Sequence, residues 1–269
     1  MDSYIIEWLN LVVRWIHVIT GIAWIGASFF FNWLDSQLTP PENPEPKVEG
    51  ELWMIHSGGF YQLEKTMISP SEIPRVLHWF KWEAYATWIS GIFLLGIVYY
   101  TGSGVYLIDS EIADLSYGMA VSISLGTILA SWLVYDFIWA SALGEKGWFP
   151  VMISFLLLFG IIWWFHQWFG SRAAYIHVGA VMGTLMVGNV WRGNIPSQTK
   201  LVEAVKAGKT PEASLGIKAK QRSLHNNYMT LPVVFIMISN HFPNTFAHYF
   251  NWAILIAIIV IGATVRHFF

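Results

Sequence analysis

The sequence predicts an all-α integral membrane protein, a bundle of about seven transmembrane helices with the N-terminus outside, on the periplasmic face. Hydrophobic residues make up 55% of the 269 residues and charged residues only 12%, whereas a soluble domain has about 25% charged residues. The apolar runs are long enough to cross about 30 Å of hydrocarbon as helices. The uneven distribution of Lys and Arg along the chain gives the orientation.

The apolar runs divide the chain into helices within a single transmembrane domain, residues 1–269. The first run is a retained helix rather than a signal peptide, because Asp2 and Glu7 stand where a signal peptide carries basic residues. Most connections are short, so sequential helices are expected to be neighbours. The predicted helices span about residues 8–34, 79–100, 117–143, 149–169, 173–191, 224–241 and 246–269.

Two longer connections, about residues 35–75 and 192–222, are predicted as cytoplasmic loops. The first begins with the Pro- and acid-rich stretch TPPENPEPKVEGE and continues as LWMIHSGGFYQLEKTMIS. This second stretch is predicted to be an amphipathic segment on the membrane surface. The second loop contains KAGKTPEASLGIKAKQR and is predicted to be polar and partly helical.

Basic residues fall almost entirely on one side of the predicted membrane. Of the 15 Lys and Arg residues, all except Arg14 and Arg172 lie on the side opposite the N-terminus. Cytoplasmic loops carry an excess of Lys and Arg, so that side is predicted to be cytoplasmic. The loop at 101–116 contains acidic residues and no basic ones, as expected for the outer side.

Two histidines on parallel helices form the leading candidate cofactor site. His17 and His177 each lie within about two turns of the predicted outer end of a helix that runs inward. Imidazoles at matching depth on two helices can ligate one haem iron from opposite faces. Arg14, on the same face as His17, can pair with a haem propionate, and Gly21 permits close approach of a flat macrocycle. The sequence thus predicts a haem b with His17 and His177 as metal ligands.

A second interpretation of these residues stays open. Histidines in membrane helices also hydrogen-bond to neighbouring helices, and glycines let helices pack closely. His248, near the outer start of the last helix, is the reserve haem ligand. His78 belongs to a separate, cytoplasmic group.

That cytoplasmic group is predicted to be a substrate pocket, a proton path or a second haem site. Ionisable side chains within a membrane are costly and usually functional, and Asp136 lies deep in an apolar helix. The alternative is a set of interfacial capping and snorkelling residues. The group consists of His78, Lys81, Glu83, Asp136, Asn189, Arg192, His225, Asn226 and Asn227.

Several classes of function are excluded or unsupported. The chain has no Cys, which excludes disulfides, iron–sulfur clusters, Cys-ligated zinc and covalent haem attachment. It has no phosphate-binding glycine loop, no His-Glu-x-x-His and no nucleophile elbow. We expect no nucleic-acid partner, because the basic residues are explained by membrane topology.

Three stretches carry a resemblance to a known family: RWIHVITGIAWIGASFFFNWLD at 14–35, GNVWRGNIPSQ at 188–198 and RSLHNNYMTLPVVFIMISNHFP at 222–243. They resemble the membrane domain of bacterial membrane-bound, cytochrome-c-linked urate oxidases. The resemblance implies oxidation of urate to 5-hydroxyisourate in the bacterial inner membrane, with electrons passed to a cytochrome c. That family carries an eighth helix and a C-terminal cytochrome c domain. This sequence has neither, so we expect a truncated chain or a separate electron-transfer subunit.

The resemblance also directs attention to the substrate site. Urate is an anion near neutral pH, so its pocket should combine Arg or Lys with amides. The cytoplasmic cluster is preferred to the outer one, which contains Arg14, Arg172, His17 and His177, because urate is made inside cells. The preferred residues are Arg192, Asn194, Arg222, His225, Asn226 and Asn227.

Two other interpretations compete with an oxidase. The chain could be a non-catalytic, haem-bearing or structural subunit of a larger membrane complex, or it could form a homo-oligomer surrounded by lipid. A transporter is a third possibility, but it would need a substrate path near the midplane, and the midplane is mostly apolar.

Overall fold

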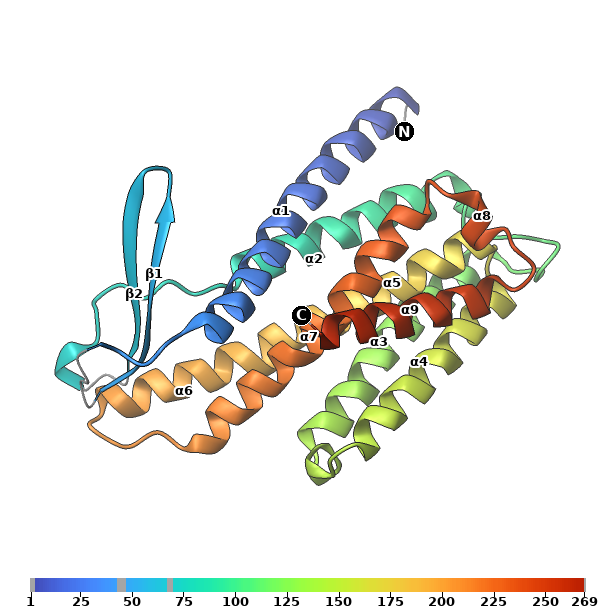
Figure 1. Ribbon diagram of the computed structural model, residues 1–269. Coiled ribbons are helices and arrows are strands. Elements are labelled where there is room, and N and C mark those ends of the chain that lie inside the picture. Colours follow the sequence, from blue (N-terminus) through green and yellow to red (C-terminus); the bar gives the residue numbers. More distant parts are fainter. Residues whose placement is uncertain (1–2, 43–46, 67–69, 269) are drawn as a thin grey trace.

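The structure is a computed structural model that describes residues 3–42, 47–66 and 70–268. It is mostly helical, as the sequence predicted, with one β-hairpin beside the helical bundle (Figure 1). The helices are α1 (Ser3–Gln37), α2 (Trp82–Leu95), α3 (Tyr117–Ala140), α4 (Phe149–Trp168), α5 (Ser171–Gly188), α6 (Ile195–Lys206), α7 (Ala213–Ser239), α8 (Pro243–Phe246) and α9 (Asn251–His267).

Helix α5 lies at the centre of the bundle. In the most apolar stretch of 18 residues within 171–206, 67% of the residues are buried. In the most apolar stretch of the same length in α1, none is buried. Small residues on α5, including Ala173 and Ala174, are fully buried and let neighbouring helices approach. Helix α1 lies at the edge and packs mainly on α2. Its exposed apolar side chains are those expected of a lipid-facing helix.

Four helical stretches among the described residues are long and apolar enough to cross a membrane: Ser3–Gln37, Tyr117–Ala140, Phe149–Trp168 and the continuous path Ser171–Lys206. Helix α9 is apolar but has only 17 residues. Helix α7 is long, but its first half carries Lys218, Lys220 and Arg222. A helical membrane bundle is therefore supported, while seven crossings and the outward N-terminus stay predictions.

Two π-helical turns extend helices of the bundle. The turn η2 (Gly96–Tyr100) continues α2, and η5 (Asn189–Asn194) joins α5 to α6. The segment 192–222, predicted as a partly helical loop, contains α6 and the first part of α7, which lie side by side (Figure 1). The polar first half of α7 therefore lies beside α6, and its apolar second half lies within the bundle.

The predicted amphipathic surface segment contains a β-hairpin. Strands β1 (Val48–His56) and β2 (Gly59–Thr66) pair antiparallel, while residues 67–69 of that prediction lie outside the described residues. Ser57 and Gly58 both have positive φ, 50° and 78°, as a two-residue turn matched to strand twist requires. Ile55 and Phe60 face each other across the strands and are exposed. The segment has the period of a strand, and its place on a membrane surface stays a prediction.

The last predicted helix, 246–269, starts later than expected. Residues 243–246 form the short helix α8, and α9 begins at Asn251. The His248 imidazole Nδ1 accepts the backbone N–H of Phe250 at 3.0 Å. This local bond competes with a continuous helix through the turn.

Candidate functional site

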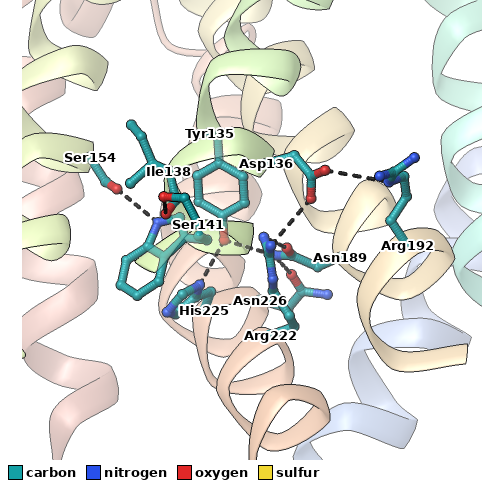
Figure 2. Close-up of polar contacts among 11 residues, drawn as sticks. Tyr135, Asp136, Ile138, Ser141, Ser154, Asn189, Arg192, Arg222, His225 and Asn226 are labelled. Carbon is teal, nitrogen blue, oxygen red and sulfur yellow. Dashed lines mark hydrogen bonds and ion pairs between the residues drawn. The ribbon is translucent and has the colours of Figure 1, made fainter. Parts of the chain in front are cut away.

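Most of the polar residues predicted at the cytoplasmic side meet in one cluster between α3, η5 and α7 (Figure 2). We call this cluster the Asp136 network. Three helical segments supply its members, so residues far apart in sequence become neighbours. The members are Tyr135, Asp136, Asn189, Arg192, Arg222, His225 and Asn226.

One carboxylate and two guanidinium groups form the charged part of the network. Asp136 Oδ1 lies 3.2 Å from Arg222 Nη2, and Asp136 Oδ2 lies 3.4 Å from Arg192 Nε. The Arg222 side chain is only 8% exposed, whereas that of Arg192 is 56% exposed. One carboxylate faces two guanidinium groups, so the network has a formal charge of +1 beside the exposed side chain of Arg192. An anionic ligand can pair with this charge.

The neutral part of the network is a chain of hydrogen bonds centred on Asn189. Its Oδ1 accepts Arg222 Nη1 at 2.9 Å, and its Nδ2 donates to the Tyr135 hydroxyl at 3.0 Å and to Asn226 Oδ1 at 2.8 Å. The Tyr135 hydroxyl lies 2.7 Å from His225 Nδ1, and the Asn226 amide also donates to the Met186 carbonyl. A continuous path of polar contacts therefore joins the charged residues to an imidazole.

The π-helical turn η5 and its glycine, Gly193, shape the site. A π-helical turn changes the direction in which side chains leave the helix, and such turns are frequent at functional sites. A Cβ atom on Gly193 would lie 2.7 Å from Arg222 Cγ. The absence of a side chain at Gly193 is what lets Arg222 pass η5 and reach Asp136.

The predicted residue Asn227 belongs to a different contact. It is buried, but its Oδ1 accepts the Ser28 hydroxyl at 2.9 Å and its Nδ2 donates to Asn32 Oδ1 at 3.1 Å. Consecutive residues on a helix point about 100° apart. Asn226 therefore faces the network, while Asn227 joins α7 to α1. Asn194, another predicted residue, donates through Nδ2 to Ser223, and its buried Oδ1 has no partner in the described structure.

His17 and His177 contact different parts of the segment formed by α2 and η2. His17 Nδ1 lies 2.9 Å from the Thr87 carbonyl, and its ring lies against Gly91. His177 is fully buried, and its ring contacts Tyr99, 5.4 Å away between centroids. Along α2 and η2 the contacts at Gly91 and Tyr99 are about 12 Å apart.

These positions bear directly on the predicted haem. The His177 Nδ1 lies 2.7 Å from the Ala173 carbonyl, and its Nε2 is buried without a partner in the described structure, so one ligand atom is free. However, aromatic rings at Phe165, Phe169 and Tyr99 surround the imidazole at 5.0–5.5 Å. Two axial ligands must lie on opposite sides of one iron. Haem b, with His17 and His177 as its ligands, stays a prediction.

The other predicted cofactor residues also lie apart from one another. Arg14 donates to Asn10 on its own helix, and Gly21 faces Thr87 of α2. His248 is exposed in the turn before α9, and His78 is 69% exposed, 3.8 Å from Glu83. Within the described ranges, no group of three or more His, Asp or Glu side chains could hold a metal ion.

Tyr135 is the network residue that sequence reasoning missed. Its side chain is 9% exposed, and its hydroxyl links Asn189 to His225. The available signal was its position directly before Asp136 in an apolar helix. Consecutive residues rarely share one helix face, so the sequence alone favoured packing for this tyrosine.

Comparison with known proteins identifies one family. The family model described as Urate oxidase N-terminal matches residues 3–269. No curated protein and no solved structure gives a match. The matched region contains every helix described above and the whole Asp136 network. The chain therefore belongs to the Urate oxidase N-terminal family.

Proposed function

We propose that the chain oxidises urate to 5-hydroxyisourate at the Asp136 network, on the cytoplasmic side of a bacterial inner membrane. The observation that carries the proposal is one carboxylate shared by two guanidinium groups, the second of them 56% exposed, in a protein of the Urate oxidase N-terminal family. The network therefore has a formal charge of +1 that a bound anion can neutralise.

Arg192 is the residue best placed to receive an anion. It contacts Asp136 through Nε, while its side chain is 56% exposed. A guanidinium has five N–H donors in a planar fork, so its remaining donors can bind an oxyanion from the open side. The buried Arg222 supplies the second positive charge, and its contacts with Asp136 and Asn189 hold it in place.

Asn194, two residues after Arg192 in η5, offers an acceptor. Its buried Oδ1 has no partner among the described residues, and its Nδ2 is held by the Ser223 hydroxyl. A buried polar atom without a partner costs about 1–3 kcal/mol. Urate carries both ring N–H donors and carbonyl acceptors, so an N–H directed at this oxygen would remove that cost.

The oxidation also requires a proton acceptor. Urate and one water give 5-hydroxyisourate, two protons and two electrons. The Tyr135 hydroxyl lies 2.7 Å from His225 Nδ1, and a hydroxyl in contact with an imidazole can take a proton while passing its own to the ring. The Tyr135–His225 pair is therefore the proposed exit for protons, and Asn189 orients the phenol.

The test is urate-dependent reduction of a soluble dye acceptor by the purified protein in nanodiscs, with oxygen excluded and 5-hydroxyisourate measured in parallel. His225→Ala and Asn226→Ala should each abolish turnover. His56→Ala, exposed at the end of strand β1, is the matched control and should retain turnover. Normal turnover in both network variants would count against this site.

A further inference from the structure

A large apolar cavity adjoins the Asp136 network. Its volume is about 1170 Å³, and its walls come from α3, α4, α5, α7 and α9. Tyr135 and His225 belong to both the network and the cavity wall. The two features therefore share one imidazole–phenol pair.

The cavity lies between the middle parts of three candidate membrane spans and is partly open at the side of the bundle. Its lining includes Ala130, Phe155 and Met182, from the middle of three candidate membrane spans. Leu156 and Val260, also on the lining, are 58% and 44% exposed. Surface at this depth faces lipid, so a molecule can enter sideways from the bilayer.

Most hydroxyl groups on the wall already have partners. Ser131 and Thr264 donate to backbone carbonyls of their own helices. Ser154 donates to a carbonyl and accepts the Trp139 indole, while Thr127 accepts the Trp164 indole. None of these four hydroxyl groups is a strong candidate to bind a polar ligand.

Two imidazole–phenol pairs are the polar groups that remain on the wall. One is Tyr135 with His225, 2.7 Å apart, and the other is Tyr228 with His267, 2.9 Å apart. In each pair Nδ1 of the ring faces the phenol. The second ring nitrogen, Nε2, can donate to a ligand when it carries the proton.

We propose that this cavity binds a lipid-soluble quinone. A quinone has two carbonyl oxygens, which can accept from the two imidazole donors, and an apolar tail, which suits the apolar walls and the lateral opening. A charged ligand would lose its hydration with no opposite charge on the wall. A lipid chain would fill the cavity but leave both donors unused.

The proposal rests on the proposed function and gives it an electron acceptor. Urate, water and quinone give 5-hydroxyisourate and quinol. Two electrons leave urate and reduce the two quinone carbonyls, and the two protons released by urate and water complete the two hydroxyl groups. His225 lies between the substrate side and the cavity, so a proton leaving through Tyr135 arrives beside the quinone.

The binding test needs no urate. Purified protein in nanodiscs is titrated with a short-tailed benzoquinone, and quenching of tryptophan fluorescence reports binding, because Trp139 and Trp164 line the cavity. Gly126→Phe places a ring in the cavity from a position where a Cβ meets no atom within 4 Å. Gly118→Phe, on the same helix with equal local space but outside the cavity, is the matched control.

Saturable binding is expected, weakened at least about tenfold by Gly126→Phe and less than about twofold by Gly118→Phe. His267→Ala should weaken it about threefold to tenfold, the loss of one hydrogen bond. Equal binding by both glycine variants, or equal binding of a tail analogue that lacks the quinone ring, would overturn the proposal. So would a haem absorption band that disappears in Gly126→Phe.

Failure of this proposal and failure of the proposed function give different results. Quinone binding that depends on Gly126, without urate-dependent quinol formation, keeps the quinone site and removes urate as its electron donor. Urate turnover with the dye acceptor, without saturable quinone binding, keeps the oxidase and overturns the quinone site.

Discussion

Replacing Arg222 by Met tests whether the Asp136 network holds the bundle together. The side chain is 8% exposed, pairs with Asp136 at 3.2 Å and donates to Asn189 at 2.9 Å. Methionine retains most of the aliphatic stem while removing the charge and the donors. The variant therefore isolates the electrostatic contribution from most of the packing.

The expected loss of stability is about 2–3 kcal/mol. Removing one partner of a buried ion pair costs about 3–5 kcal/mol, because the other charge stays buried. Here the Asp136 side chain is 17% exposed and keeps Arg192 at 3.4 Å, which lowers the figure. The carbonyl oxygen of the Asn189 side chain also loses its donor, which contributes to the cost.

Thermal unfolding in detergent, followed by intrinsic fluorescence, measures the effect as a lower Tm. Lys47→Met is the matched control, because its pair with Glu72 is about half exposed and such pairs contribute less than about 1 kcal/mol. The double variant Asp136→Leu with Arg222→Met should recover part of the loss, since no buried charge is then left alone. A single variant no less stable than Lys47→Met would refute the reasoning.

Four other outcomes are expected. Tyr135→Phe should lower urate turnover by about 10²- to 10⁴-fold, the usual contribution of a proton-transfer group, with urate Kd changed less than about tenfold in equilibrium titration. Gly193→Ala should raise urate Kd about tenfold in the same titration, because its methyl group meets the buried arginine, whereas Gly183→Ala, with open space around it, should not. Hypoxanthine, a neutral purine, should bind at least about tenfold more weakly than urate, the minimum expected for losing one charged hydrogen bond. Because the chain has no native Cys, an introduced Cys is the only labelling site. Ser110→Cys, on the predicted outer side, should react with a membrane-impermeant maleimide on intact cells, whereas Ser214→Cys should react only after permeabilisation. Labelling of both variants from one side would contradict the predicted topology.

The Asp136 network could largely be predicted from the sequence. Asp136, Arg192 and Arg222 carry charge next to apolar runs, and polar groups at such places must pair with one another. The same rule predicts that Asn189, Asn226 and Asn227 have polar partners. It does not predict which partners they have, because Asn226 and Asn227 are adjacent in sequence yet face different helices.

The predicted pairing of His17 with His177 shows why depth is hard to estimate. The sequence suggested equal depth because each histidine follows the start of an apolar run. In the structure His17 lies about 21 Å along α1 from Ser3, whereas His177 lies about 9 Å along α5 from Ser171. Helix α1 begins five residues before the predicted start at residue 8, so the start of the apolar run did not mark the start of the helix.

The single unbalanced charge of the Asp136 network links its structure to its proposed chemistry. With Asp136 absent, two guanidinium groups would repel each other in a place of low polarity; with a second carboxylate, an anion would be excluded. One carboxylate orients both arginines and leaves a charge that one urate anion neutralises. Bound urate would then sit beside the Tyr135–His225 pair, where losing electrons and losing protons together avoid building new charge in the membrane. Under the proposed function, the residues of the network would favour an oxidation in which protons and electrons leave on the same side, toward the apolar cavity.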